Sequence, residues 1–344
     1  MKLNKYILFL LTVLSFVSCG GNTEKKGEEY KSFQGEIFGT YYHISYSEGK
    51  TANVTQAGLD SVFAAINNSL SVYVPTSTIS KINQNVDSVM LDSLFIKVYQ
   101  TAQYVSTETG GAFDMTVAPL VNLWGFGFEH SDSITKEMID SIMPTIGFHK
   151  LHLVDGKIVK ENPKTMLDAS AIAKGFSSDC VADYLRACGS ENFMVEIGGE
   201  IVVQGTNPKG EKWSIGVTKP YEGNSVDQPD MQAVIRLTDC GMATSGNYRR
   251  FYHVDGMKIS HTINPATGYP VNHSLLSATV IMSDCMTADA FATAFMVVGL
   301  DSAMSIASKH PEMSTYFIYA DSVDNQLHTI GTGRFNEMVV EECK

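Results

Sequence analysis

The chain has 344 residues, of which 44% are hydrophobic and 18% charged, and 25 Lys and Arg against 37 Asp and Glu give a formal net charge of −12. This composition excludes a disordered tail, a collagen-like repeat and a small disulfide scaffold. The acidic balance leaves no basic footprint for nucleic acid, so we expect no nucleic-acid partner. The length allows two average domains or one large unit.

The N-terminus has the features of an export signal. Two lysines, at positions 2 and 5, precede an apolar run from Tyr6 to Val17, and small residues flank Cys19. As a helix this run spans only about 18 Å, against about 30 Å for a membrane's hydrocarbon core, so a stable transmembrane anchor is not expected. Residues 17–20 resemble a bacterial lipobox, which implies cleavage before Cys19 and a diacylglycerol on its sulfur. The alternative is an ordinary secreted protein that is cut nearby.

The rest of the chain divides into a tether and one folded unit. We expect residues 1–18 to be a lipoprotein signal peptide and the polar residues 19–32 to be a flexible tether from the lipidated Cys19. No linker is visible between residues 33 and 340, which favours a single catalytic unit there. The expected location is the cell envelope, with the protein lipid-anchored to a bacterial membrane and facing the periplasm.

Apolar residues at helical spacing predict four helices. The first covers residues 56–69, and the second runs through residues 94–105 and stops at a glycine pair. The third follows Asp168 and stops at Gly189, and the fourth begins near Thr287.

Pairs of short strands lie between these helices. Residues 151–154 and 157–160 flank an Asp-Gly pair, the two-residue turn that a type I′ hairpin favours, and residues 253–259 repeat the pattern. Residues 193–203 have the pattern of two strands separated by a glycine pair. Because hairpins imply antiparallel pairing and helices and strands alternate irregularly, the sequence indicates an α+β fold.

Asp289 and Thr293 are candidate metal ligands. On a helix they lie one turn apart and share a face, while Phe291 and Phe295 fall on the opposite side. A carboxylate and a hydroxyl are hard oxygen ligands suited to Mg²⁺, which takes its remaining ligands from water and phosphate. The alternative is that Asp289 caps its own helix and Thr293 has no role.

Two further segments combine small residues with charge. Asp168 precedes a helix, the small residues after it allow the backbone to approach a ligand, and Lys174 can reach an anionic group. The alternative there is an N-cap aspartate followed by a solvated lysine. Residues 109–117 place glycines, Phe113 and Asp114 directly after a helix, which suits a flat heteroaromatic ligand, although such aromatic rings more often simply belong to the core.

Of the nine histidines, His261 is the candidate general base. It lies after the second hairpin, at the start of a polar loop rich in Pro and Gly, where an imidazole can exchange protons near neutral pH. The alternative is a histidine whose ring is satisfied by backbone groups.

Taken together and in this order, several segments resemble the ApbE family of FAD:protein FMN transferases. Among them are the motifs Ile197-Gly198-Gly199-Glu200 and Asp168 to Gly175. The full set covers nearly the whole chain after the tether and comprises residues 38–42, 70–73, 80–83, 111–127, 168–175, 197–200, 244–248, 261–268 and 288–293.

The resemblance implies a single α+β unit that holds FAD as its substrate in a cleft, with Mg²⁺ at the diphosphate. It implies that the metal is held by the backbone carbonyl of Ala171 and the side chains of Asp289 and Thr293. The implied reaction transfers FMN from FAD to a Thr or Ser hydroxyl of an acceptor protein of a membrane redox complex, with His261 taking the hydroxyl proton and AMP leaving. Nucleotide contacts are implied for Phe38, Tyr73, Ala112, Phe113, Asp114, Asp168, Lys174 and Ile263.

Three positions depart from the family pattern. Phe38 stands where methionine is common, an apolar exchange, and Asn247 and Asn264 stand where aspartate is frequent. The two asparagines remove possible negative charges near the ligand, which leaves His261 as the expected base. Two other functions remain open: an FAD diphosphatase that releases FMN and AMP, and a non-catalytic flavin-binding lipoprotein.

Overall fold

The computed structural model describes residues 29–49, 53–127, 134–224, 228–247, 251–254, 257–321 and 326–343. The expected signal peptide, residues 1–18, and the expected lipidation site at Cys19 lie outside these residues. Within them, every helix is too short or too polar to cross a bilayer.

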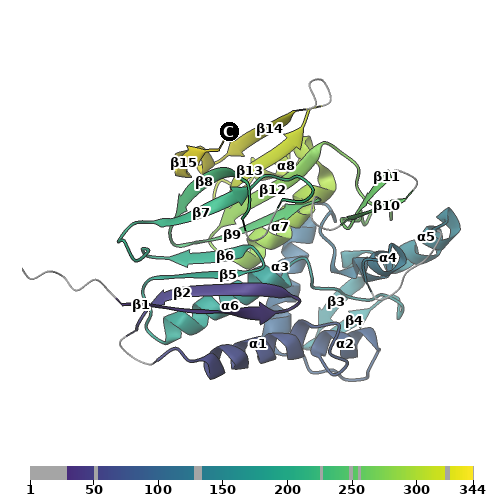
Figure 1. The fold of residues 1–344 in the computed structure, drawn as a ribbon. Helices are drawn as coiled ribbons and strands as arrows, with labels where there is room; N and C mark the ends of the chain where they lie inside the picture. The colour runs from purple at the N-terminus through teal and green to yellow at the C-terminus, as the bar shows by residue number, and fades with distance from the viewer. Residues whose placement is uncertain are drawn as a thin grey trace, which may run out of the picture.

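An eight-stranded sheet forms the centre of the molecule (Figure 1). The strand order is β1-β2-β5-β6-β9-β12-β13-β14, and all neighbouring strands run antiparallel. The sheet therefore combines segments from both ends of the described chain. Its strands are β1 (Tyr30–Ile37), β2 (Thr40–Ser47), β5 (Phe193–Ile197), β6 (Glu200–Gln204), β9 (Cys240–Gly246), β12 (Leu275–Met282), β13 (Ser314–Ala320) and β14 (Leu327–Thr332).

Smaller sheets pack around this centre. A three-stranded sheet has the order β15-β8-β7, and β3 with β4 and β10 with β11 form two hairpins. The strands are β3 (Leu151–Val154), β4 (Lys157–Lys160), β7 (Trp213–Thr218), β8 (Met231–Leu237), β10 (Phe251–Val254), β11 (Met257–Ser260) and β15 (Val339–Glu342).

The longer helices pack on one face of the central sheet. The α-helices are α1 (Gln56–Leu70), α2 (Thr78–Asn83), α3 (Ser93–Glu108), α4 (Ala118–Leu123), α5 (Lys136–Ile142), α6 (Ala173–Ala187), α7 (Cys285–Val298), α8 (Leu300–Ala307) and α9 (Phe335–Met338). Short 3₁₀ turns are formed by Met115–Val117, Met143–Thr145 and Phe148–Lys150.

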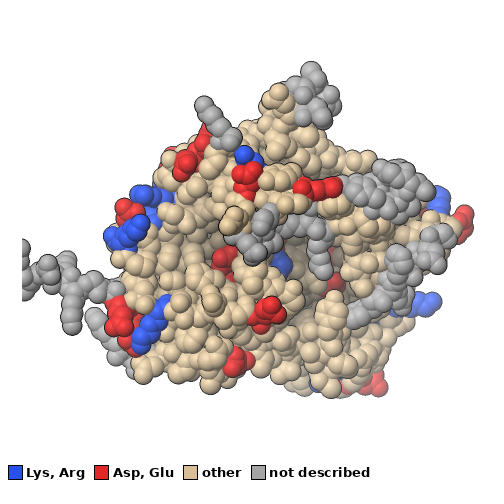
Figure 2. Space-filling view, viewed as in Figure 1, with Lys and Arg blue, Asp and Glu red and all other residues tan. Residues whose placement is uncertain are grey.

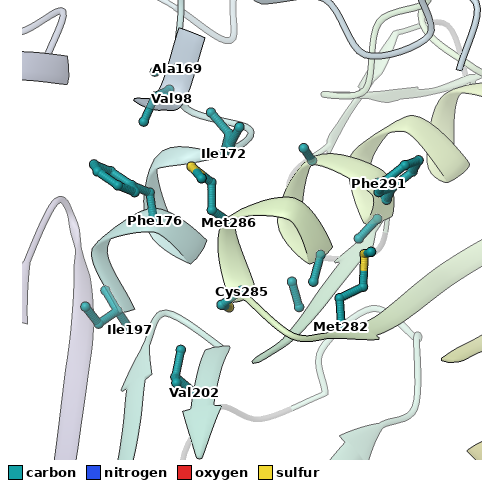
Figure 3. Packing of buried hydrophobic residues seen from close by; sticks show 14 of the residues in the cluster. Val98, Ala169, Ile172, Phe176, Ile197, Val202, Met282, Cys285, Met286 and Phe291 are labelled. Carbon is teal, nitrogen blue, oxygen red and sulfur yellow. The ribbon is translucent and has the colours of Figure 1, made fainter. Parts of the chain in front are cut away.

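The largest hydrophobic core lies between the sheet and helices α1, α3, α6 and α7. Figure 3 shows its centre, where Phe176 of α6 and Met286 of α7 lie above Ile197 and Val202 of the sheet. Burial of each such side chain contributes roughly 1.5–3 kcal/mol to stability. This packing fixes α6 and α7 relative to one another and to β6.

A second core covers the opposite face of the sheet. Because side chains alternate along a strand, Val202 of β6 enters the first core while Ile201 and Val203 join Trp213 and Ile235 of the smaller sheet in the second. Strand β6 is thus buried on both faces, and a charged residue in it requires a partner.

The α+β class predicted from the sequence is confirmed, as are the elements on which it depends. The predicted helix at residues 56–69 is α1, whose N-cap Thr55 accepts a hydrogen bond from the Gly58 N–H. The predicted hairpin at residues 151–160 is β3-β4, and its turn residues Asp155 and Gly156 have φ values of 49° and 71°, as a type I′ turn requires.

The limits of the fold differ slightly from those expected. Strand β1 begins at Tyr30 rather than near residue 33, so residues 30–32 of the expected tether belong to the sheet, where they pair with β2. At the other end β15 extends to Glu342, beyond the expected limit of 340. Backbone pairing, which the polar composition of these segments does not reveal, accounts for both differences.

Candidate active site

A cavity of about 570 Å³ lies where helix ends and loops meet the central sheet. Its wall contains residues from Tyr41 on β2 to Val297 on α7, including parts of α2, the β5-β6 turn, β7 and β9. Figure 2 shows a hollow near the centre of one face, with acidic and basic side chains both visible at it.

The cavity brings together the predicted site residues, with one exception. Phe38 does not line it, because this residue lies in the β1-β2 turn, where its φ is 54°. Its ring is edge-on to that of Phe63, with 5.8 Å between the ring centroids. A nucleotide contact from Phe38 therefore stays a prediction. The predicted residues in the cavity wall are Tyr73, Ala112, Phe113, Asp114, Asp168, Ala171, Lys174, His261, Ile263, Asp289 and Thr293.

Asp289 and Thr293 face the cavity from consecutive turns of α7. The N-cap of this helix is Asp284, which accepts from the Thr287 N–H at 2.8 Å, so Asp289 does not cap its own helix. Asp289 is only 4% exposed and accepts a hydrogen bond from the Gly175 N–H at 3.0 Å. Burial raises the pKa of the Asp289 carboxyl, while the charge of Lys174 opposes that shift.

Lys174 and Glu200 form an ion pair beside Asp289. Lys174 lies in the first turn of α6, and its ammonium contacts Glu200 Oε1. The lysine side chain is 34% exposed and that of Glu200 only 4%; because its ammonium pairs with this buried carboxylate, Lys174 is not the unpaired, solvated lysine of the alternative interpretation. Burial raises the pKa of Glu200 to about 7, although the Lys174 charge acts in the opposite direction.

A turn before α6 presents Asp168 and Ala171 to the cavity. The helix begins at Ala173, several residues later than its predicted start after Asp168, and Asp168 does not cap it. Instead Asp168 Oδ1 accepts from the N–H and the hydroxyl of Ser170, at 2.7 and 2.5 Å. The turn is held to α2 by Asn83, whose amide exchanges two hydrogen bonds with the backbone of Leu167.

Asp114 has a structural role in its own loop. Its carboxylate accepts from the N–H and hydroxyl of Thr116 and from the Phe148 N–H, all within 2.8 Å. Burial raises the pKa of this carboxyl despite those hydrogen bonds. The Phe113 side chain is 2% exposed and belongs to the main core. Contacts from this loop to a nucleotide would therefore come mainly from its backbone.

His261 lines the cavity from the loop that directly follows β11. Its ring lies edge-on to that of Phe126, with 6.3 Å between the ring centroids. The two asparagines that depart from the family pattern are used within this region: Asn247 Oδ1 accepts from the Thr262 hydroxyl at 2.7 Å, and Asn264 Oδ1 accepts from the Ala266 N–H at 2.9 Å.

The residues present are compatible with a hard divalent cation. Across the described parts of the chain, no three His, Cys, Asp or Glu side chains gather as a ready metal site. Asp289, Thr293 and the Ala171 carbonyl nevertheless offer only oxygen donors, and they share the cavity with a buried carboxylate oxygen, Glu200 Oε2, that has no hydrogen-bond partner. One protein carboxylate leaves most of the coordination sphere to water and substrate, as Mg²⁺ prefers.

Comparison with known protein families agrees with this geometry. Residues 38–317, which contain the whole cavity wall, match the model of the ApbE family. The chain belongs to the ApbE family. Among curated members, the FAD:protein FMN transferase of Vibrio cholerae is 36% identical over 312 residues, covering 89% of this chain and 91% of its own. That of Haemophilus influenzae is 34% identical over 350 residues and covers 98% of each chain.

Solved ApbE structures share the fold. The flavin transferase ApbE from Vibrio cholerae superposes with a TM-score of 0.81 at 35% identity, covering 90% of this chain and 99% of the other. The apo form of the Pseudomonas stutzeri flavinyl transferase ApbE gives a TM-score of 0.80 at 26% identity, covering 90% and 97%. The ApbE fold is thus retained over nearly all of the described chain.

Sequence reasoning did not identify Glu200 or Asn83 as site residues, although both lie in segments that resemble the family. A signal for Glu200 was present, because it is a carboxylate at the head of an otherwise apolar strand, directly after a glycine pair. Such a position is buried and requires a cation nearby. No comparable signal marks Asn83, whose contact with Leu167 spans 84 residues of sequence.

Proposed function

We propose that this chain is an FAD:protein FMN transferase. The supporting observation is that Lys174, Asp289 and His261 line the same cavity, within a family whose curated members carry this activity in their names. A cation, an acidic metal ligand and an imidazole are the groups needed to bind a diphosphate and move a proton beside it.

The proposed reaction is a phosphoryl-type transfer. The hydroxyl oxygen of a Thr or Ser on the acceptor protein attacks the FMN-side phosphorus of FAD. A new O–P bond forms, the bond between that phosphorus and the bridging oxygen breaks, and AMP leaves with the bridging oxygen. An imidazole nitrogen of His261 takes the hydroxyl proton, a role worth about 10²- to 10⁴-fold in rate.

Different residues of the cavity wall would contact different parts of FAD. The Lys174 ammonium would meet the negative charge of the diphosphate, and the chain as a whole, with net charge −12, offers no such attraction. Backbone groups of residues 112–114 and the turn at Asp168 would contact the nucleotide, because the carboxylates of Asp114 and Asp168 are already hydrogen-bonded. Tyr73 and Ile263 line the remaining wall, and Phe38 stands at the neighbouring hairpin turn.

Mg²⁺ is the metal that the donor set fits. Asp289, Thr293 and the Ala171 carbonyl would hold it, and when bound it acts as a Lewis acid that neutralises charge on the diphosphate. Asp289 is the main anchor of this set, since it is the only carboxylate in it.

Lipid anchoring at Cys19 is part of the same proposal. The lipobox-like residues 17–20 support cleavage before Cys19 and its lipidation. An enzyme held at the periplasmic side of a bacterial membrane would lie next to acceptor subunits of membrane redox complexes.

A single assay tests the transferase activity. The purified protein is incubated with FAD, Mg²⁺ and an acceptor protein, and covalent flavin fluorescence is read on a denaturing gel together with AMP release. We expect labelled acceptor, loss of label with EDTA, and at least about 100-fold slower labelling by Asp289→Ala. Asp301→Ala, a change at an exposed aspartate of α8, serves as the control and should label at the normal rate.

Two outcomes would contradict the transferase activity, and a third would contradict the metal role of Asp289. AMP released at the same rate without acceptor would identify an FAD diphosphatase instead. Flavin bound without label or AMP would identify a non-catalytic flavin-binding protein. Unchanged labelling by Asp289→Ala would remove that residue from the metal site.

A further inference from the structure

Three charged side chains form a cluster on one wall of the cavity. Lys174, at the start of α6, contacts Glu200 Oε1, and the next residue, Gly175, donates its N–H to Asp289 Oδ2 at 3.0 Å. The first turn of α6 therefore lies between a carboxylate of β6 and a carboxylate of α7. The three residues all line the cavity.

The cluster contains one cation and two carboxylates, both of them deeply buried. Glu200 is 3% and Asp289 4% exposed. A buried charge is stable only with a close partner, so the two carboxylates compete for the single ammonium. In the structure Glu200 has this partner, and Asp289 is left with a backbone N–H.

Asp289 lies beside the same stretch of α6, because its Oδ2 accepts the N–H of Gly175, the residue after Lys174, and both side chains line the cavity. A lysine side chain is a flexible four-carbon stem with a compact charge at its end, so it can change partner with small rotations. Without the Glu200 carboxylate, Asp289 would be the remaining carboxylate of the cluster.

We propose that Glu200 is a positioning residue that holds Lys174 away from Asp289 and so keeps the Asp289 carboxylate available to a divalent cation. This inference rests on the proposed function only in taking Asp289 as the cation ligand. Glu200 itself needs no contact with substrate.

The test is a titration of the full chain with Mn²⁺, a spectroscopic substitute for Mg²⁺, in the absence of FAD. Free Mn²⁺ is counted by electron paramagnetic resonance for the wild type, Glu200→Gln, Lys174→Met and the double variant. We expect Glu200→Gln to weaken Mn²⁺ binding by 10-fold or more, because Lys174 then pairs with Asp289. Lys174→Met and the double variant should both bind Mn²⁺ within about threefold of the wild type, because the competing ammonium is gone.

The recovery in the double variant distinguishes positioning from a merely structural role. If Glu200 only stabilised the fold, adding Lys174→Met would leave Mn²⁺ binding as weak as in Glu200→Gln, or weaker, and the inference would be wrong. Unchanged binding by Glu200→Gln, or no saturable binding by the wild type, would also overturn it. Glutamine matches glutamate in shape, and thermal unfolding of each variant reports whether the fold is kept.

If Glu200→Gln does not fold, Glu200→Asp replaces it. Aspartate keeps the charge but is one methylene shorter, so we expect an intermediate loss of Mn²⁺ binding that Lys174→Met again removes. The acceptor assay is independent of this series. If the wild type and the variants rank in Mn²⁺ affinity as expected but the wild type transfers no FMN, the proposed function would be wrong and the role of Glu200 would stand.

Discussion

The carboxylates of the cavity wall differ in how many hydrogen bonds and ion pairs they already form with other residues of the protein. Asp114 and Asp168 each accept hydrogen bonds from neighbouring N–H and hydroxyl groups, which fixes the loops that carry them. Asp289 accepts one N–H, and Glu200 holds Lys174. Of these carboxylates, Asp289 on α7 is therefore the one that retains most capacity for a further ligand.

His261 supplies the first prediction at this scale. We expect His261→Ala to lower kcat for FMN transfer by about 10²- to 10⁴-fold while FAD affinity changes little, because the imidazole moves a proton and does not hold the nucleotide. Steady-state kinetics with acceptor, and fluorescence titration with FAD, measure the two quantities. His152→Ala is the control, since His152 is exposed and pairs with Glu161 away from the cavity. A loss confined to FAD affinity would assign His261 to binding.

At the scale of elements, α6 and α7 depend on each other. Asp179 of α6 accepts hydrogen bonds from the N–H groups of Cys285 and Met286, at 3.0 and 2.8 Å, and so satisfies the first turn of α7. Gly175 of α6 in turn donates to Asp289 of α7. Asp289, the proposed metal ligand, is thus placed by a helix pair whose contact includes the buried carboxylate of Asp179.

The ionisation of Asp179 should make stability depend on pH. Burial raises the pKa of Asp179 to about 7, although the two N–H groups oppose that shift. Because this pKa is above the ordinary value of 3.8, the folded state binds the proton more tightly than the unfolded state, and stability falls as pH rises from about 4 to 7. The free-energy difference between wild type and Asp179→Asn should change by up to about 1.4 kcal/mol per pH unit in that window.

Urea unfolding of the wild type and of Asp179→Asn at several pH values measures this difference. Groups that titrate in both proteins contribute equally to both free energies of unfolding, so their effects cancel in the difference. Asp183→Asn is the matched control on the same helix, because Asp183 is 62% exposed and pairs with Arg186. Because the Asp183 side chain is exposed, this variant should unfold with a free energy within about 0.5 kcal/mol of the wild type. A flat curve for Asp179→Asn would show that the Asp179 carboxyl titrates normally in the folded protein.

At the scale of the whole molecule, the fold and the expected anchor are separate in sequence. The first strand begins at Tyr30, and every residue of the cavity wall follows it. Changes at Cys19 should therefore alter where the protein is found without altering the site.

Cys19→Ser tests this separation. We expect the variant to move from the membrane to the soluble fraction of lysed cells, because it lacks the acyl chains that contribute about 0.8 kcal/mol per buried CH₂ to membrane binding. Its rate of FMN transfer to a soluble acceptor should equal that of the wild type. Cys343→Ser, a change at a partly exposed cysteine, should stay with the membrane. Retention of Cys19→Ser at the membrane would disprove lipidation at this residue.

Local spacing was sufficient for the secondary structure and for part of the site. The periodicity of residues 56–69, the Asp-Gly turn of β3-β4 and the common face of Asp289 and Thr293 are all set by neighbours within one or two turns of chain. Such features follow from backbone geometry, and the structure has them where the sequence predicts them. The resemblance of whole segments to the ApbE family then indicated which of these local features belong together.

The order of the eight strands and the partners of the buried charges could not be predicted from the sequence, because only the tertiary structure determines them. Lys174 meets Glu200 across 26 residues and Gly175 meets Asp289 across 114, and no local pattern specifies either contact. These pairs arise because the packing of α6, α7 and β6 buries Glu200 and Asp289, so that Lys174 and the first turn of α6 are the groups left to pair with them. Burial, which is a property of the assembled layers, therefore determined how the charges of the site are shared.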